Sequence, residues 1–212
     1  MAVLAIIAAA AVVTTTASGF GHRNLLLRPR IVLFALNSIL VIRASSASSS
    51  GSVVTLLDYG AGNVRSLRNA IHYLGFEVED VQTPKDILNA ERLIFPGVGA
   101  FASAMDVLVK TGMDEALRTY IKNDRPFPGI CLGLQLLFEY SEENGPVNGL
   151  GLIPGVVGRF NSSNGFRVPH VGWNALQIAK DSEILEDVGD HQHVYFVHSY
   201  RAMPVCSSLS TS

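Results

Sequence analysis

The chain has 212 residues, of which 48% are hydrophobic and 16% are charged, a length sufficient for one domain with a buried core. All 18 acidic residues and 12 of the 16 basic residues lie after residue 52, so that part has a formal net charge of −6. A mildly acidic domain without a basic stripe excludes an electrostatic case for nucleic-acid binding. The two cysteines, Cys131 and Cys206, do not make a disulfide framework and favour free thiols in a reducing compartment.

The N-terminal segment, residues 1–52, has the composition of an organelle transit peptide. It contains no Asp, Glu or Lys, carries four arginines and ends in a Ser-rich run over 44–50. Residues 41–44, Val-Ile-Arg-Ala, are similar to the cleavage context of plastid transit peptides, which predicts a plastid location. The apolar runs 3–13 and 31–42 are shorter than the ~20 residues of a membrane-spanning helix, so no membrane partner is expected. A secretory signal peptide and an incorrectly assigned start remain as alternatives.

From residue 53 onward, short apolar runs alternate with amphipathic stretches. The runs 53–57, 76–81, 92–95 and 127–130 predict strands, and the stretches 63–74, 84–90, 101–122 and 132–141 predict helices, the third with a possible break at Gly112. Because most of these strands are continuously apolar, we expect a parallel α/β sheet covered by helices on both faces. After residue 145 the best strand candidates are 152–160, 173–178 and 194–197.

Residues 129–133, Gly-Ile-Cys-Leu-Gly, place Cys131 between a predicted strand and a predicted helix. This Gly-x-nucleophile-x-Gly pattern is typical of the nucleophile elbow of α/β enzymes, where the tight turn requires glycines. The helix N-terminus is expected to lower the pKa of the thiol, and the Leu132 N–H would be available to an oxyanion. The alternative is a buried structural cysteine, which the spacing makes less favourable.

Two further glycine-rich segments follow predicted strands. Residues 96–99, Pro-Gly-Val-Gly, would expose backbone N–H groups to a ligand, although an ordinary turn has the same composition. Residues 58–63, Asp-Tyr-Gly-Ala-Gly-Asn, lack the third glycine of a dinucleotide fingerprint at the required spacing, so no cofactor is predicted.

Together these motifs resemble a known family. Residues 127–135, Phe-Pro-Gly-Ile-Cys-Leu-Gly-Leu-Gln, resemble the nucleophile motif of class I glutamine amidotransferases. Residues 58–63, 96–101, 149–157 and 168–174 narrow the resemblance to the glutaminase part of imidazole glycerol phosphate synthases, and the N-terminal segment favours the bifunctional plastid form. The resemblance implies a three-layer α/β fold with a mostly parallel central sheet, and a cyclase barrel as the normally fused partner.

The resemblance also implies roles for individual residues. Cys131 would attack the side-chain amide of glutamine and form a thioester, with Gly97, Val98 and Leu132 at the oxyanion. Gln135 and the segment His198, Ser199 and Tyr200 match positions that hold the glutamine substrate. His170, Trp173 and Asn174 match the surface that faces the cyclase.

One element of the family pattern is not present in these 212 residues. The family's base is a histidine in a His-Pro-Glu run, and none of the six histidines here is followed by Pro-Glu. Residues 205–212 do not resemble the family, so they are interpreted as an anomalous tail after a partial domain at 53–204 that lacks the closing strands. We therefore expect weak or no glutaminase activity and marginal stability.

The remaining histidines have alternative interpretations. His198 could replace the base, but the family places this position at the substrate. His191 and His193, near Asp190, could ligate a metal, whereas a surface loop is the simpler interpretation, so no metal site is predicted. His72 is expected to be structural.

Three functions remain open from the sequence. The first is the glutaminase of an imidazole glycerol phosphate synthase. The second is the glutaminase partner of a chorismate-using synthase, against which residues 168–174 argue. The third is a non-catalytic module that binds glutamine or docks on a cyclase.

Overall fold

The structure is a computed structural model that describes residues 53–60, 64–163, 165, 167–175 and 193–204. The expected transit segment, the predicted tail at 205–212, His191 and Cys206 lie outside the described residues. Among the helices of the described ranges, none combines the length and the apolar character that crossing a membrane requires.

Four parallel strands form the central sheet in the order β2-β1-β3-β4. They are β1 (Val53–Leu56), β2 (Glu77–Asp80), β3 (Leu93–Gly97) and β4 (Gly129–Cys131). The register of β3 against β4 pairs Phe95 with Gly129 and Gly97 with Cys131. The glycine-rich turn after β3 and the predicted nucleophile therefore lie side by side at the carboxyl edge of the sheet, where α/β proteins commonly bind ligands.

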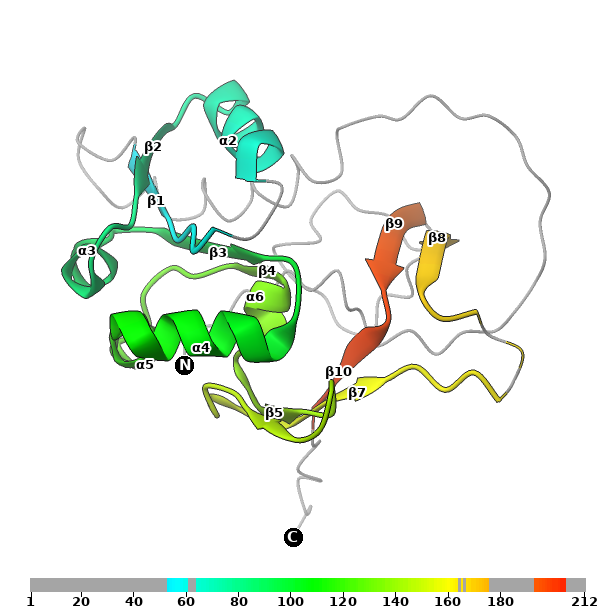
Figure 1. Cartoon of the computed structure of the whole chain (residues 1–212). Coiled ribbons are helices and arrows are strands. Elements are labelled where there is room, and N and C mark those ends of the chain that lie inside the picture. Colours follow the sequence, from blue (N-terminus) through cyan, green and yellow to red (C-terminus); the bar gives the residue numbers. More distant parts are fainter. Residues whose placement is uncertain (1–52, 61–63, 164, 166, 176–192, 205–212) are drawn as a thin grey trace, which may run out of the picture.

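Helices cover both faces of this sheet, as the apolar strands predicted. Helix α2 (Val64–Tyr73) packs its buried residues against β1 and β3 in one apolar cluster. Helices α3 (Pro84–Asn89), α4 (Phe101–Thr111) and α5 (Met113–Lys122) contribute to the second cluster on the opposite face (Figure 1). The predicted break at Gly112 is confirmed, because this residue has a φ of 71° and ends α4.

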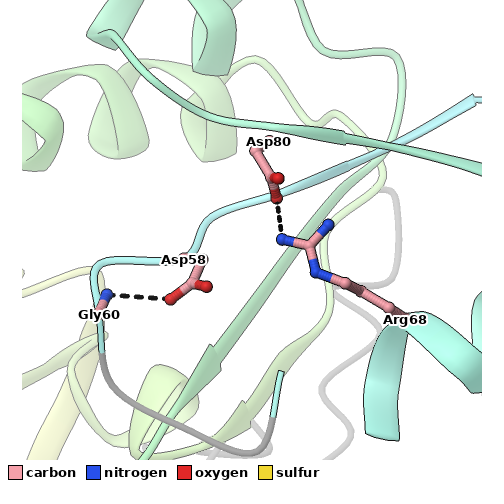
Figure 2. A network of polar contacts seen from close by, with 4 residues as sticks. All are labelled: Asp58, Gly60, Arg68 and Asp80. Carbon is pink, nitrogen blue, oxygen red and sulfur yellow. Dashed lines mark hydrogen bonds and ion pairs between the residues drawn. The ribbon is translucent and has the colours of Figure 1, made fainter. Parts of the chain in front are cut away.

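An ion pair connects α2 to the edge of the sheet. The guanidinium of Arg68 in α2 contacts the carboxylate of Asp80 at the end of β2 (Figure 2). Beside it, Asp58 Oδ1 accepts the backbone N–H of Gly60 at 2.9 Å. This side-chain hydrogen bond shapes the turn that follows β1.

The predicted helix over 132–141 is wrong beyond its first turn. Helix α6 (Leu132–Gln135) ends early, and strand β5 (Phe138–Ser141) follows. The reason is tertiary: the carbonyls of Leu136 and Leu137 accept the N–H groups of Leu150 and Leu152 at 2.7 and 2.8 Å. Those carbonyls are no longer available to a helix, and both leucines are buried in the core at the turn before β5.

The second half of the domain forms two smaller sheets. One has the order β10-β7-β5-β6, with β6 at Val147–Asn148, β7 at Ile153–Arg159 and β10 at Tyr200–Pro204. The other pairs β8 (His170–Ala175) with β9 (His193–His198) in antiparallel register. Strands β7 and β9 were predicted, and β8 overlaps the predicted strand 173–178, whose last three residues lie outside the described residues. Strands β6 and β10 were not predicted.

Candidate active site

The backbone of Cys131 adopts the sharp turn that the glycine pattern predicted. This residue ends β4 and precedes α6 with φ 55° and ψ −117°, a region that L side chains rarely occupy. A non-glycine residue in such a conformation is held there by its surroundings, and such positions concentrate at functional sites. The turn presents the side chain at the carboxyl end of β4, as in a nucleophile elbow.

Three glycines leave the space that this turn requires. A Cβ on Gly133 would overlap the carbonyl oxygen of Phe95 in β3. A Cβ on Gly129 would lie 3.0 Å from the backbone of Leu134, and one on Gly97 would lie 2.7 Å from the backbone nitrogen of Gly133. Strand β3, strand β4 and the start of α6 therefore approach more closely than side chains would allow.

The electrostatics of the thiol differ from the expectation. Burial raises the pKa of Cys131 above its ordinary value, and the hydrogen bond from the Leu132 N–H lowers it by less than that. The expected net lowering is wrong, because α6 has four residues and a correspondingly small dipole, whereas desolvation penalises the thiolate. At neutral pH the free chain holds Cys131 chiefly as a thiol.

The predicted oxyanion residues lie next to Cys131 in the sequence or in the β3–β4 register. The Leu132 N–H hydrogen-bonds the Cys131 sulfur, and this bond stabilises the thiolate. Gly97 is the partner of Cys131 in the β3–β4 register, and Val98 follows it with 47% of its surface exposed. Gly99 has a φ of 102°, so the turn after β3 is flanked by glycines.

Part of the predicted substrate-binding set also converges here. The Nε2 of Gln135, in α6, donates to the carbonyl oxygen of Tyr200 at 3.3 Å. This bond spans 65 residues and brings β10 to the end of the helix that starts at the nucleophile. Gln135 and Tyr200, which were predicted to bind the substrate, are therefore neighbours.

His198 belongs to an aromatic cluster around β8 and β9. Its ring stacks on His170 at 6.2 Å between centroids and lies 5.4 Å from Phe160 and 5.5 Å from Phe196. Burial, and then the neighbouring His170, lower the pKa of His198. Within the described residues, no histidine hydrogen-bonds the Cys131 thiol, and the ranges described contain no cluster of three metal-ligating side chains.

The β8–β9 pair divides the predicted interface residues between its two faces. Trp173 lies on the face that also exposes Val171 and Val197, with 47, 54 and 57% of their surfaces accessible. His170 and Asn174 alternate with Trp173 along β8, and they are joined by a 3.1 Å contact between their side chains. They therefore lie on the less exposed face of the β8–β9 pair, together with His198.

Two residues at this edge carried no role in the sequence reading. The carboxylate of Glu143 accepts the N–H of Phe101 at 2.8 Å, which anchors the start of α4 directly after the 97–99 turn. Tyr59, in the turn after β1, places a buried hydroxyl beside Gly97. The position of Tyr59 at the end of an apolar strand could have indicated a site residue. Nothing in the sequence around Glu143 indicated its hydrogen-bond partner.

Comparisons with known proteins agree with this geometry. The family model for "Glutamine amidotransferase class-I" matches residues 55–212. The chloroplastic imidazole glycerol phosphate synthase hisHF of Arabidopsis thaliana is 76% identical over 165 residues, which cover 78% of this chain and 27% of that protein. The imidazole glycerol phosphate synthase subunit HisH of Caldanaerobacter subterraneus subsp. tengcongensis is 48% identical over 148 residues, covering 70% of this chain and 72% of that subunit.

A solved structure described as "Crystal structure of glutamine amidotransferase" has a TM-score of 0.51. It is 19% identical in sequence and covers 71% of this chain and 72% of that chain, so the likeness concerns the fold alone. The chain therefore spans 27% of the plant relative and nearly three quarters of the bacterial subunit.

The steric role of Gly133 leads to a stability prediction. We expect Gly133→Ala to lower the free energy of unfolding by about 3 kcal/mol, because the added methyl group meets the immobile carbonyl of Phe95. Urea unfolding of the full chain measures this change. Gly172→Ala is the matched control, since a Cβ at that strand position meets no atom within 4 Å, and it should change stability by less than about 0.5 kcal/mol. Equal stability of the two variants would contradict the steric argument.

Proposed function

Because the chain belongs to the class-I glutamine amidotransferase family, we propose that it is the glutaminase part of an imidazole glycerol phosphate synthase in histidine biosynthesis. In this role it hydrolyses glutamine to glutamate and delivers ammonia to a cyclase. The observation that carries the proposal is the strained elbow of Cys131, with the Leu132 N–H directed at its sulfur. The names and identities of the plant and bacterial relatives support the choice of synthase.

The proposed chemistry has two steps. Cys131 Sγ attacks the side-chain amide carbon of glutamine, and the negative oxygen of the tetrahedral intermediate is held by the Leu132 N–H and the backbone of Gly97 and Val98. The C–N bond then breaks, and the amide NH₂ leaves as ammonia with the proton of the thiol. Water adds to the thioester, which releases glutamate and restores the thiol.

Proton transfer is the step of this chemistry to which the described residues assign no base. No histidine of the described residues hydrogen-bonds the Cys131 thiol, and the 212 residues contain no His-Pro-Glu run. General acid–base assistance is worth roughly 10²–10⁴-fold. We therefore propose that a base acting at this site accelerates both steps by this factor.

The glutamine substrate is proposed to lie between α6 and β10. The side chain of Gln135 is buried and is fixed by its bond to the Tyr200 carbonyl, so its remaining amide atoms face a defined direction. Ser199 and His198 immediately precede Tyr200 and are proposed to bind the amino-acid end of the substrate. Gln135 and residues 198–200 are far apart in the sequence and meet only in the folded chain, as is usual for a specific binding site.

The exposed face of the β8–β9 pair is proposed to dock on the cyclase barrel. Val171, Trp173 and Val197 expose a contiguous apolar row, and an aromatic residue in such a row is typical of the centre of an interface. The plant relative, whose name joins HisH and HisF, is far longer than this chain and supports a cyclase as the partner.

We also propose that residues 1–52 direct the protein to plastids. The Arg-bearing, acid-free composition and the chloroplastic relative support this location. A fusion of residues 1–52 to a fluorescent reporter is expected to accumulate in plastids of plant cells. A secreted or cytosolic reporter would rule the proposal out.

Covalent labelling tests the glutaminase proposal without requiring turnover. A chloroketone analogue of glutamine is expected to alkylate Cys131 once per chain in a Cys206→Ser background, located by mass spectrometry of peptides. L-glutamine in excess should slow labelling at least ~10-fold, because it occupies the same site, whereas D-glutamine should not.

The controls separate a formed site from a merely reactive thiol. Cys131→Ser must abolish labelling, and the rate of Cys131 alkylation by iodoacetamide, which does not resemble glutamine, gives the intrinsic reactivity of the thiol for comparison. A folded chain that the chloroketone labels no faster than iodoacetamide does would reject the glutaminase proposal and leave a docking module.

The docking proposal concerns binding to a separately produced cyclase barrel. We expect Trp173→Ala to raise the Kd for the barrel by about 30-fold, corresponding to ~2 kcal/mol for an interface aromatic. Tyr73→Ala is the matched control, since Tyr73 is 81% exposed on α2, outside the β8–β9 pair, and its removal should leave the Kd within about 2-fold. Calorimetric titration measures both, and equal Kd values for the two variants would contradict the assigned face.

A further inference from the structure

The hydroxyl of Tyr59 is buried and has no hydrogen-bond partner within the part of the chain that the structure describes. Buried hydroxyl groups are normally paired, and an unpaired one at an active site calls for an explanation. The proposed chemistry of Cys131 does not use it.

This hydroxyl lies against both halves of the proposed oxyanion site. A Cβ built on Gly97 would lie 2.6 Å from Tyr59 Oη, 2.7 Å from the Gly133 nitrogen and 3.0 Å from the Leu132 Cβ. Tyr59 Oη therefore occupies the space beside Gly97 that opens toward the start of α6. Because position 97 is a glycine, no side chain lies between the Tyr59 hydroxyl and the backbone at that position.

The phenol ring packs against the core, whereas the turn beside it is exposed at Val98. The ring packs edge-on against Phe95 with centroids 5.8 Å apart, and Asp58 Oδ1 bonds the N–H of Gly60 across the backbone of Tyr59 (Figure 2). The turn after β3 carries a glycine at each end and an exposed Val98 between them. Any adjustment that gives the hydroxyl a partner therefore falls on the turn.

The hydroxyl can act only as a neutral group. Burial raises the pKa of the Tyr59 phenol well above its usual value, and the nearby charges of Cys131 and Asp58 raise it further. The group is consequently a hydrogen-bond donor throughout the physiological range and cannot serve as a base.

We propose that Tyr59 is a positioning residue for glutamine hydrolysis, whose hydroxyl donates a hydrogen bond to the backbone of the 97–99 turn when glutamine occupies the site. This bond fixes the orientation of the Gly97 and Val98 peptide that receives the oxyanion. The inference rests on the proposed glutaminase function and adds a residue that the nucleophile motif does not contain.

Acylation by an activated ester tests this role without general acid catalysis. The γ-(4-nitrophenyl) ester of glutamate carries a leaving group that departs without a proton, so a burst of nitrophenolate reports attack by Cys131 alone. We expect Tyr59→Phe to lower the burst rate constant by about 10-fold at saturating ester, with the half-saturating concentration unchanged, because the lost bond acts on the transition state.

Further readouts separate positioning from folding. The burst amplitude counts the folded sites to which the rate is normalised, and the rate of Cys131 alkylation by iodoacetamide should stay within about 2-fold, since it needs no oxyanion site. The urea midpoint should stay equal or rise, because an unpaired buried hydroxyl is removed. Tyr73→Phe, at an exposed position, is the matched control and should leave all values unchanged.

The outcomes distinguish the two proposals. A slower burst with unchanged alkylation supports the role of Tyr59. Equal burst rates in the original chain and Tyr59→Phe overturn that role and leave the glutaminase proposal intact. No burst from either chain, although both are folded, overturns the glutaminase proposal and the inference together.

Discussion

The backbone of Cys131 lies at φ 55°, and the arrangement of the surrounding strands depends on keeping it there. The turn exists because Gly129 and Gly133 let β3, β4 and α6 approach to backbone contact. The parallel register then sets Gly97 opposite Cys131, so the turn after β3 lies beside Cys131 without any further element. The apolar clusters on the two faces of the sheet hold this register and thereby stabilise a conformation that is unfavourable by itself.

The close packing that shapes the turn also determines its electrostatics. Burial of Cys131 favours the thiol, and α6 is too short for its dipole to offset that effect. The helix is short because the chain must leave it at Leu136 to pair with residues 150–152. That departure in turn creates β5 and the second sheet, through which β10 brings Tyr200 to Gln135. A longer helix would favour the thiolate but would prevent Leu136 and Leu137 from pairing with residues 150–152.

Much of the first half could be predicted from sequence because its signals are local. Apolar runs, a helix break at Gly112 and the glycine spacing around Cys131 each depend on a few neighbouring residues. The end of α6, the strands β6 and β10 and the raised thiol pKa could not, because each depends on partners far away in the chain. The buried position of the Tyr59 hydroxyl could not be predicted either, since its environment is formed by Gly97 and the start of α6.

The β8–β9 pair places the two proposed recognition functions on opposite faces of two strands. Trp173 and Val197 face outward, whereas His170 and His198 pair across the strands on the less exposed face, next to Phe160. His198 leads directly through Ser199 to Tyr200, whose carbonyl holds Gln135. A partner bound on the outer face would therefore contact strands that continue, within three residues, into the proposed glutamine site. That face and Gln135 are thus connected by the chain from Val197 to Tyr200 and by one hydrogen bond.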